Sequence, residues 1–170
     1  MQTTSVKLYS LHYDSAKTYL VAAAFVFGNI LLPQLCHAVP QGGMRLLPIY
    51  FFTLVGAYKY GWRAGLLTAV LSPLINSALF GMPAVENLPA ILLKSVLLAA
   101  AAGAAAARYK RVSLPIMILV VLSYQIVGTL GEWAIKGDLT LALQDFRIGA
   151  AGMLLQIFGG WAVIRYLLRK

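Results

Sequence analysis

The chain is short of charged residues and almost without cysteine. Only 11% of its 170 residues are Asp, Glu, Lys or Arg, whereas 61% are hydrophobic, and the mean hydropathy is +0.80. Because soluble domains carry about 25% charged residues, this composition excludes an ordinary soluble domain. The single cysteine, Cys36, excludes an intrachain disulfide.

Several functional motifs are also absent from the sequence. It has no G-x-x-x-x-G-K-[ST] phosphate loop, no H-E-x-x-H pair and no G-x-S-x-G elbow. The chain therefore does not hydrolyse ATP itself, and we expect neither enzymatic activity nor a cofactor. No span carries the arginine ladder of a voltage sensor or a filter-like carbonyl motif.

Long apolar runs take up most of the chain. In a bilayer every backbone polar group must be satisfied internally, which leaves helix bundles and closed barrels. Runs of about 20 residues fit helices, and the alternation typical of barrel strands is absent. The sequence predicts an all-α membrane protein, a six-transmembrane-helix bundle that forms one integral membrane domain over residues 1–170. The spans lie near 17–35, 46–60, 64–81, 88–107, 113–134 and 148–168, after an interfacial segment at 1–16.

Basic residues are concentrated in alternate gaps between these spans. Short cytoplasmic loops retain Lys and Arg, so both termini and the 1–16 segment should be cytoplasmic. The net charge of +9 reflects this topology, and we expect no nucleic-acid partner. Ten of the fourteen basic residues share these gaps: Lys7, Lys17, Lys59, Arg63, Arg108, Lys110, Arg111, Arg165, Arg169 and Lys170. The opposite gaps, together with the span ends that adjoin them, hold Arg45, Lys94, Lys136 and Arg147, with Glu86, Glu132, Asp138 and Asp145.

Cys36 and His37 are adjacent in the first connection on the outer side. A thiolate beside an imidazole suits a soft or borderline metal, including the metal of a tetrapyrrole. Equally, a lone cysteine is often a small apolar residue, and a lone histidine near an interface is often only hydrogen-bonded. Metal ligation and a structural role both remain open for this pair.

Further polar residues gather at the outer ends of the spans, where burial in lipid would be costly. A cation, an anion and an amide that converge on an outer cavity would suit a small polar organic ligand. The alternatives are structural: Lys94 pairs with Glu86 or Glu132, Asn87 caps a helix, and Gln125 bonds to Gln156. The candidate ligand-binding residues are Cys36, His37, Gln41, Arg45, Asn76, Glu86, Asn87, Lys94, Tyr124, Gln125, Glu132, Trp133 and Arg147.

The layout resembles the substrate-binding S component of energy-coupling factor transporters. The chain shares with them six short spans, both ends inside, a small-residue face on the first span and polar outer connections. The stretch FFTLVGAYKYGWRAGLLTAVLSPLINSALFG (51–81) is similar to their second and third spans, in which an aromatic-glycine turn precedes a Gly- and Ala-rich helix. The first-span docking motif, Ala-x-x-x-Ala, is approximated by Ala24-x-x-x-Gly28.

The resemblance implies a multi-pass protein of a bacterial cell (inner) membrane, surrounded by the lipid bilayer. It would bind a vitamin or related micronutrient from outside and join a transmembrane coupling subunit and two cytoplasmic ATPases. The chain begins Met1-Gln2 rather than Met-His, which disfavours nickel or cobalt as cargo. An organic micronutrient is the expectation, with a corrinoid or other metal-bearing tetrapyrrole as a narrower hypothesis that uses Cys36.

Two other classes of function remain open. The chain could be an integral membrane enzyme that uses Cys36 or His37 at an outward-facing site. It could also be a small structural membrane protein whose outer polar residues pair with one another.

Overall fold

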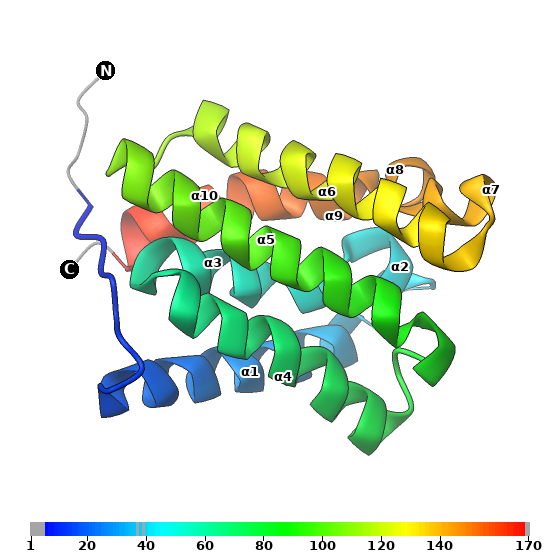
Figure 1. Ribbon diagram of the computed structural model, residues 1–170, viewed down its shortest axis with the longest axis horizontal. Helices are drawn as coiled ribbons and strands as arrows, with labels where there is room; N and C mark the ends of the chain where they lie inside the picture. The colour runs from blue at the N-terminus through cyan, green and yellow to red at the C-terminus, as the bar shows by residue number, and fades with distance from the viewer. Residues whose placement is uncertain (1–5, 37, 39, 169–170) are drawn as a thin grey trace.

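The computed structural model describes residues 6–36, 38 and 40–168, and over these residues the chain is helical and has no strand (Figure 1). The predicted all-α class is therefore confirmed. Within the described part of the chain, five segments are long and apolar enough to cross a membrane. They are α1 (Ala16–Cys36), α4 (Trp62–Phe80), Val85–Tyr109 with η2 (Val85–Asn87) and α5 (Leu88–Tyr109), α6 (Leu114–Lys136) and Ala150–Leu167.

The last of these segments is irregular. It consists of α9 (Ala150–Leu154), η3 (Leu155–Gly159), α10 (Gly160–Ala162) and η4 (Val163–Leu167), of which η3 and η4 are π-helical. Two short helices, α7 (Leu139–Ala142) and α8 (Gln144–Arg147), connect it to α6. Asp138 caps α7, because its side chain accepts hydrogen bonds from the backbone N–H groups of Thr140 and Leu141.

The region of the predicted second span is broken in the structure. It contains α2 (Gly42–Leu46), η1 (Pro48–Tyr50) and α3 (Phe51–Tyr60) instead of one continuous helix near 46–60. Leu47 separates the pieces in a left-handed conformation, with φ of 47°, and Pro48 lacks the N–H that would continue a helix. Pro33, by contrast, lies inside α1, which continues to Cys36.

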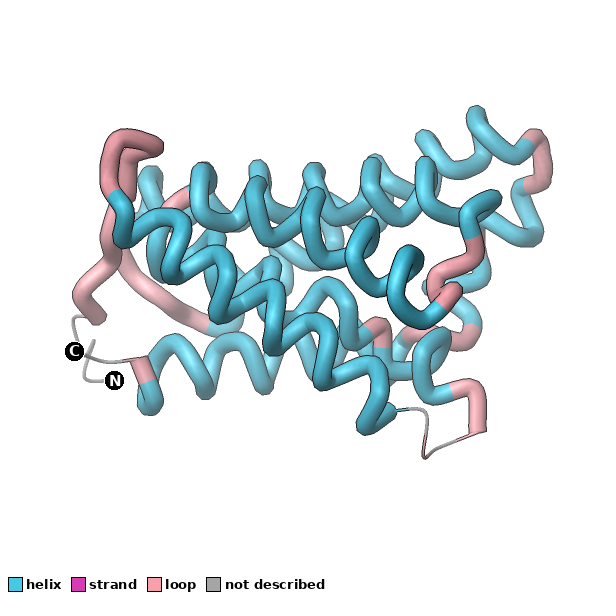
Figure 2. The backbone as a smooth tube through the Cα atoms, turned by 90° about the horizontal axis from the view of Figure 1, so that it is seen from below, coloured by secondary structure: helices cyan, strands magenta, loops and turns pink. Residues whose placement is uncertain are grey.

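The described residues form a bundle of helices joined by loops (Figure 2), and the ten-residue helix α3 lies inside it. Eight of its residues are buried, and it packs against α1, α4 and α5. Glycines permit the close approach of these helices. A Cβ on Gly65 of α4 would lie 2.3 Å from the Cβ of Ala57, and one on Gly28 of α1 would lie 2.8 Å from the Phe52 ring. Gly28 therefore serves packing inside the bundle, while Ala24, the other half of the approximate docking motif, is exposed.

The first described residues and the last helical turns lie at the same end of the bundle (Figure 1). The N-terminal segment docks there in extended form on the turn between α3 and α4. The N–H of Tyr9 donates to the carbonyl of Lys59 at 2.8 Å, and that of Leu11 to Tyr60 at 3.0 Å. The rings of Tyr9 and Tyr60 stack with their centroids 5.6 Å apart. We call this the basic end, because the turns that carry most of the cations lie here.

Candidate functional site

A cavity of about 630 Å³ opens at the other end of the bundle, which we call the cavity end. Such a volume is in the range of pockets for small organic ligands, about 300–1,000 Å³. Its walls come from segments far apart in the chain: the end of α1, the α2–η1 region, the α4–α5 connection, and the α6–α8 region. The broken second span and the residue before it supply eight of the lining residues: Gln41, Gly42, Gly43, Met44, Leu47, Pro48, Ile49 and Tyr50.

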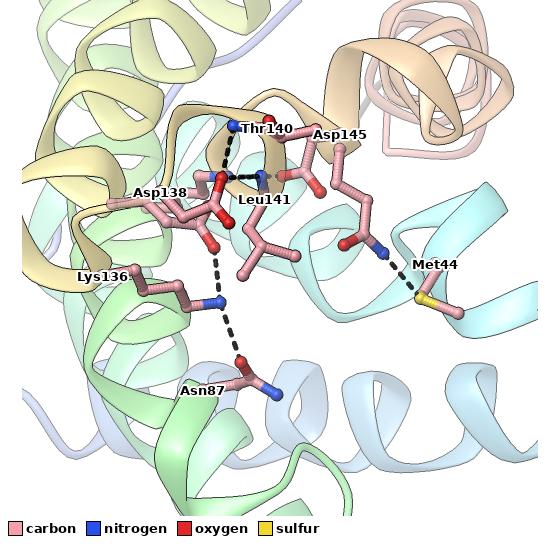
Figure 3. Close-up of polar contacts among 10 residues, drawn as sticks. Met44, Asn87, Lys136, Asp138, Thr140, Leu141 and Asp145 are labelled. Carbon is pink, nitrogen blue, oxygen red and sulfur yellow. Dashed lines mark hydrogen bonds and ion pairs between the residues drawn. The ribbon is translucent and has the colours of Figure 1, made fainter.

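Among the described residues, four charged side chains line this cavity and form one connected cluster. The Nζ of Lys94 lies 2.5 Å from Glu132 Oε2 and 2.7 Å from Asp145 Oδ2. The Nζ of Lys136 lies 2.8 Å from Glu132 Oε1 and donates a second bond, also 2.8 Å, to Asn87 Oδ1 (Figure 3). The Lys94 side chain is only 2% exposed, so its charge depends on the two carboxylates.

The packing of Lys94 explains how a buried lysine reaches these carboxylates. Its stem crosses α6 at Gly128, where an added Cβ would lie 2.6 Å from Lys94 Cγ. The glycine lets the stem pass close to the α6 backbone, and the ammonium group then lies beside Glu132, one turn further along α6. Only a residue without a side chain can accommodate the stem at this crossing.

A second set of buried polar side chains connects α1, α3 and α4 beside the cavity. Asn29 Nδ2 donates to Thr53 Oγ1 and to Ser72 Oγ, each at 3.1 Å, and Asn29 Oδ1 accepts from the backbone N–H of Phe52 at 3.1 Å. The last bond satisfies a donor near the N-terminus of α3, where N–H groups have no partner within the helix. Asn76, which lines the cavity, completes the group. We call these side chains the asparagine network: Asn29, Thr53, Ser72 and Asn76.

Behind the cavity wall lies a third polar contact. The Tyr50 ring, which lines the cavity, packs 5.7 Å from that of Tyr124, whose hydroxyl donates to Gln156 Oε1 at 2.8 Å. Gln125 is buried, and both its amide atoms are without a hydrogen-bond partner among the described residues. The suggested bond between Gln125 and Gln156 is therefore wrong.

The structure brings some of the sequence-predicted residues together and separates others. Of the two partners suggested for Lys94, Glu132 is confirmed. The predicted residues that line the cavity are Gln41, Asn76, Asn87, Lys94 and Glu132, with Tyr124 and Gln125 buried outside its lining. Those that are exposed and outside the lining are Arg45, Glu86, Trp133 and Arg147. Asn87 precedes α5, but its side chain makes no capping bond there and instead accepts from Lys136.

The predicted metal pair is described only in part. Cys36 is buried, with 7% exposure, and is not a lining residue; His37 lies outside the described residues. Within the described part of the chain, no group of three or more His, Cys, Asp or Glu side chains is placed to hold a metal ion.

The sequence did not predict five polar or aromatic residues that line the cavity: Gln34, Tyr50, Lys136, Gln144 and Asp145. Lys136 could have been found, because it follows Glu132 by four residues on one helix and such pairs meet. Asp145 and Gln144 sit on the short helix α8, whose position depends on tertiary packing; Gln144 Nε2 donates to the sulfur of Met44 at 2.8 Å across the cavity.

Comparisons with known proteins found no relative of this chain. The chain matches no family model, no curated protein and no solved structure.

Proposed function

We propose that this protein is the substrate-binding membrane subunit of an energy-coupling factor type importer for a vitamin or related micronutrient. The observation that carries the proposal is the cavity at one end of an apolar helical bundle, of ligand size and lined by charged, amide, aromatic and apolar groups. Ligand sites in proteins commonly combine a mostly apolar wall with a few well-placed polar groups.

The broken second span supports the same proposal. In many transporters, discontinuous helices form the substrate site, because the interrupted backbone is tolerated where it lines a cavity. In the proposed topology α2, η1 and α3 together form a sixth crossing, and the break at Leu47 lies in the cavity wall. With six crossings both termini would lie on one side of the membrane, and the excess of Lys and Arg at the basic end favours the cytoplasm for that side.

The proposed cargo is an organic micronutrient. The described lining contains no cysteine or histidine side chain, so nothing in it favours a ligand-borne metal over an all-organic ligand. As the resemblance implies, the proposed partners are a transmembrane coupling subunit and two cytoplasmic ATPases, and the proposed location is the cell (inner) membrane of a bacterium.

The direct test is mass spectrometry of the small molecule that copurifies with the full chain in mild detergent. The expected result is one organic molecule in about equal molar amount, which is lost on Lys94→Met and retained on the matched surface change Arg108→Met at the basic end. A purified, folded protein that retains no small molecule and binds none of a broad vitamin panel would contradict the proposal.

A further inference from the structure

Asn76 has an unusual set of partners. It is 1% exposed and lines the cavity. Its Nδ2 donates to the backbone carbonyl of Asn29 at 3.0 Å and to that of Ser72 at 2.9 Å. The first acceptor is available because Pro33, four residues after Asn29, has no N–H with which to bond that carbonyl inside α1. Pro33 thus creates the acceptor to which Asn76 binds.

These bonds fix the orientation of the Asn76 amide. A backbone carbonyl oxygen can only accept, so the side-chain NH₂ group must face the carbonyls of Asn29 and Ser72, and the reversed amide would set oxygen against oxygen. Both hydrogens of Nδ2 are then used. Oδ1 is left without a hydrogen-bond partner among the described residues. An acceptor buried in this way is costly unless a donor meets it.

The charges of the cavity constrain the ligand in a second way. Lys94 and Lys136 carry two positive charges, and Glu132 and Asp145 carry two negative ones, so the charged side chains of the described lining sum to zero. Because each is already paired, a ligand with a net charge would enter a partly buried site that offers no unmatched charge of opposite sign.

We propose that Asn76 Oδ1 is the specificity-determining acceptor of the cavity, and that the ligand is a net-uncharged organic molecule that presents an N–H or O–H group to it. This inference rests on the proposed function, because it assigns ligand chemistry to the same cavity. It goes further in stating which hydrogen-bond polarity the ligand must have and which charge it must lack.

The experiment uses two pairs of neutral probes in which one member has lost its donor by methylation. The pairs are riboflavin with 3-methylriboflavin and nicotinamide with N,N-dimethylnicotinamide, and the anion nicotinate tests the charge. Binding to the full chain in detergent is measured by equilibrium dialysis. In at least one pair the donor-bearing member should bind at least about tenfold more tightly than its methylated partner, since a site built to bond an N–H rejects an analogue without it.

Variants assign that discrimination to Asn76. Asn76→Leu should bring the members of the discriminated pair to within about twofold of each other, because the acceptor is gone. Thr53→Val is the matched control: it removes one bond of the asparagine network but does not line the cavity, so the discrimination should persist. Should Asn76→Leu fail to fold, the comparison of paired probes on the unchanged protein still decides the ligand chemistry.

Three results would overturn the inference. They are equal or tighter binding of the methylated members, tighter binding of nicotinate than of nicotinamide, and no binding of either donor-bearing member at millimolar concentration. The proposed function fails on a different result, the absence of any copurifying or panel ligand, so the two failures are distinguishable.

Discussion

The two ends of the bundle use charge in opposite ways. At the cavity end, cations meet carboxylates: Lys94 and Lys136 share Glu132, and Lys94 also reaches Asp145. At the basic end, cations lie over aromatic rings, as Lys17 does over Tyr9, with its Nζ 4.8 Å from the ring centroid. Lys17 is exposed and can lie on an aromatic ring without a carboxylate partner, whereas Lys94, inside the bundle, is paired with two carboxylates. The two ends therefore differ in how their cations are stabilised: by carboxylates at the cavity end and by aromatic rings at the basic end.

The most severe disruption of this contrast is Lys94→Met. It leaves Glu132 and Asp145 without their buried cation, which should lower the free energy of unfolding by about 3–5 kcal/mol. Chemical denaturation in detergent measures the change. The matched change at the basic end, Arg108→Met, should alter stability by no more than about 0.5 kcal/mol, since Arg108 is exposed. Equal effects of the two substitutions would refute the contrast.

Asn29→Leu tests whether the uncharged asparagine network contributes as much to the free energy of unfolding as the ion pairs do. It removes the partners of Thr53, Ser72 and the Phe52 N–H, and each buried group left unpaired costs roughly 1–3 kcal/mol. We expect a total loss of about 3 kcal/mol by the same measurement. Thr53→Val removes only one of these bonds and should cost about 1 kcal/mol; a larger loss in Thr53→Val than in Asn29→Leu would be inconsistent with Asn29 as the centre of the network.

Tyr9→Ala probes the basic end. It removes the stack on Tyr60 and the ring beneath Lys7, Lys17 and Lys59, which should cost about 1–2 kcal/mol. Thermal unfolding monitored by circular dichroism reports the loss. Tyr19→Ala is the control, because Tyr19 is an exposed tyrosine of α1 with 51% exposure and should change stability little. An identical unfolding temperature for both variants would show that the N-terminal segment does not stabilise this end.

The smallest expected effect on stability is that of Lys136→Met. This lysine is 22% exposed and pairs with Glu132 one helical turn away, so its loss should cost about 0.5 kcal/mol. The substitution also leaves the charged side chains of the lining with a net charge of −1. We therefore expect the loss of ligand-binding free energy to exceed the loss of unfolding free energy. Lys136→Arg, which keeps the charge, should retain binding. A destabilisation as large as that of Lys94→Met would contradict the expectation that a buried ion pair contributes more stability than a partly exposed one.

The sequence predicted those features that depend on local patterns. Apolar length indicated the all-α class, and the polarity of span ends pointed to Asn76, Asn87, Lys94 and Glu132 as neighbours of one site. The pairing of Lys94 with Glu132 could be foreseen as one of two alternatives, because a lysine inside a span needs a carboxylate within reach.

Other features depend on how distant segments pack. The importance of Asn29 was missed, although Pro33 four residues later offered a signal, since it frees a carbonyl that some other donor must satisfy. Pro48 signals the break at Leu47, because the residue before a proline is biased away from helix, but the predicted span bounds near 46–60 run across it. No local pattern could place Asp145 beside Lys94, because α8 reaches the cavity only through the turn that follows α6.

The orientation of the two ends is the central claim, and labelling of single cysteines on intact cells tests it most directly. In a Cys36→Ala background, a cysteine is introduced by Ala84→Cys, at an exposed position of the cavity lining, or by Arg108→Cys at the basic end. A membrane-impermeant maleimide should label the Ala84→Cys protein on intact cells and the Arg108→Cys protein only after permeabilisation. The reverse pattern would place the cavity in the cytoplasm and contradict the account of an importer.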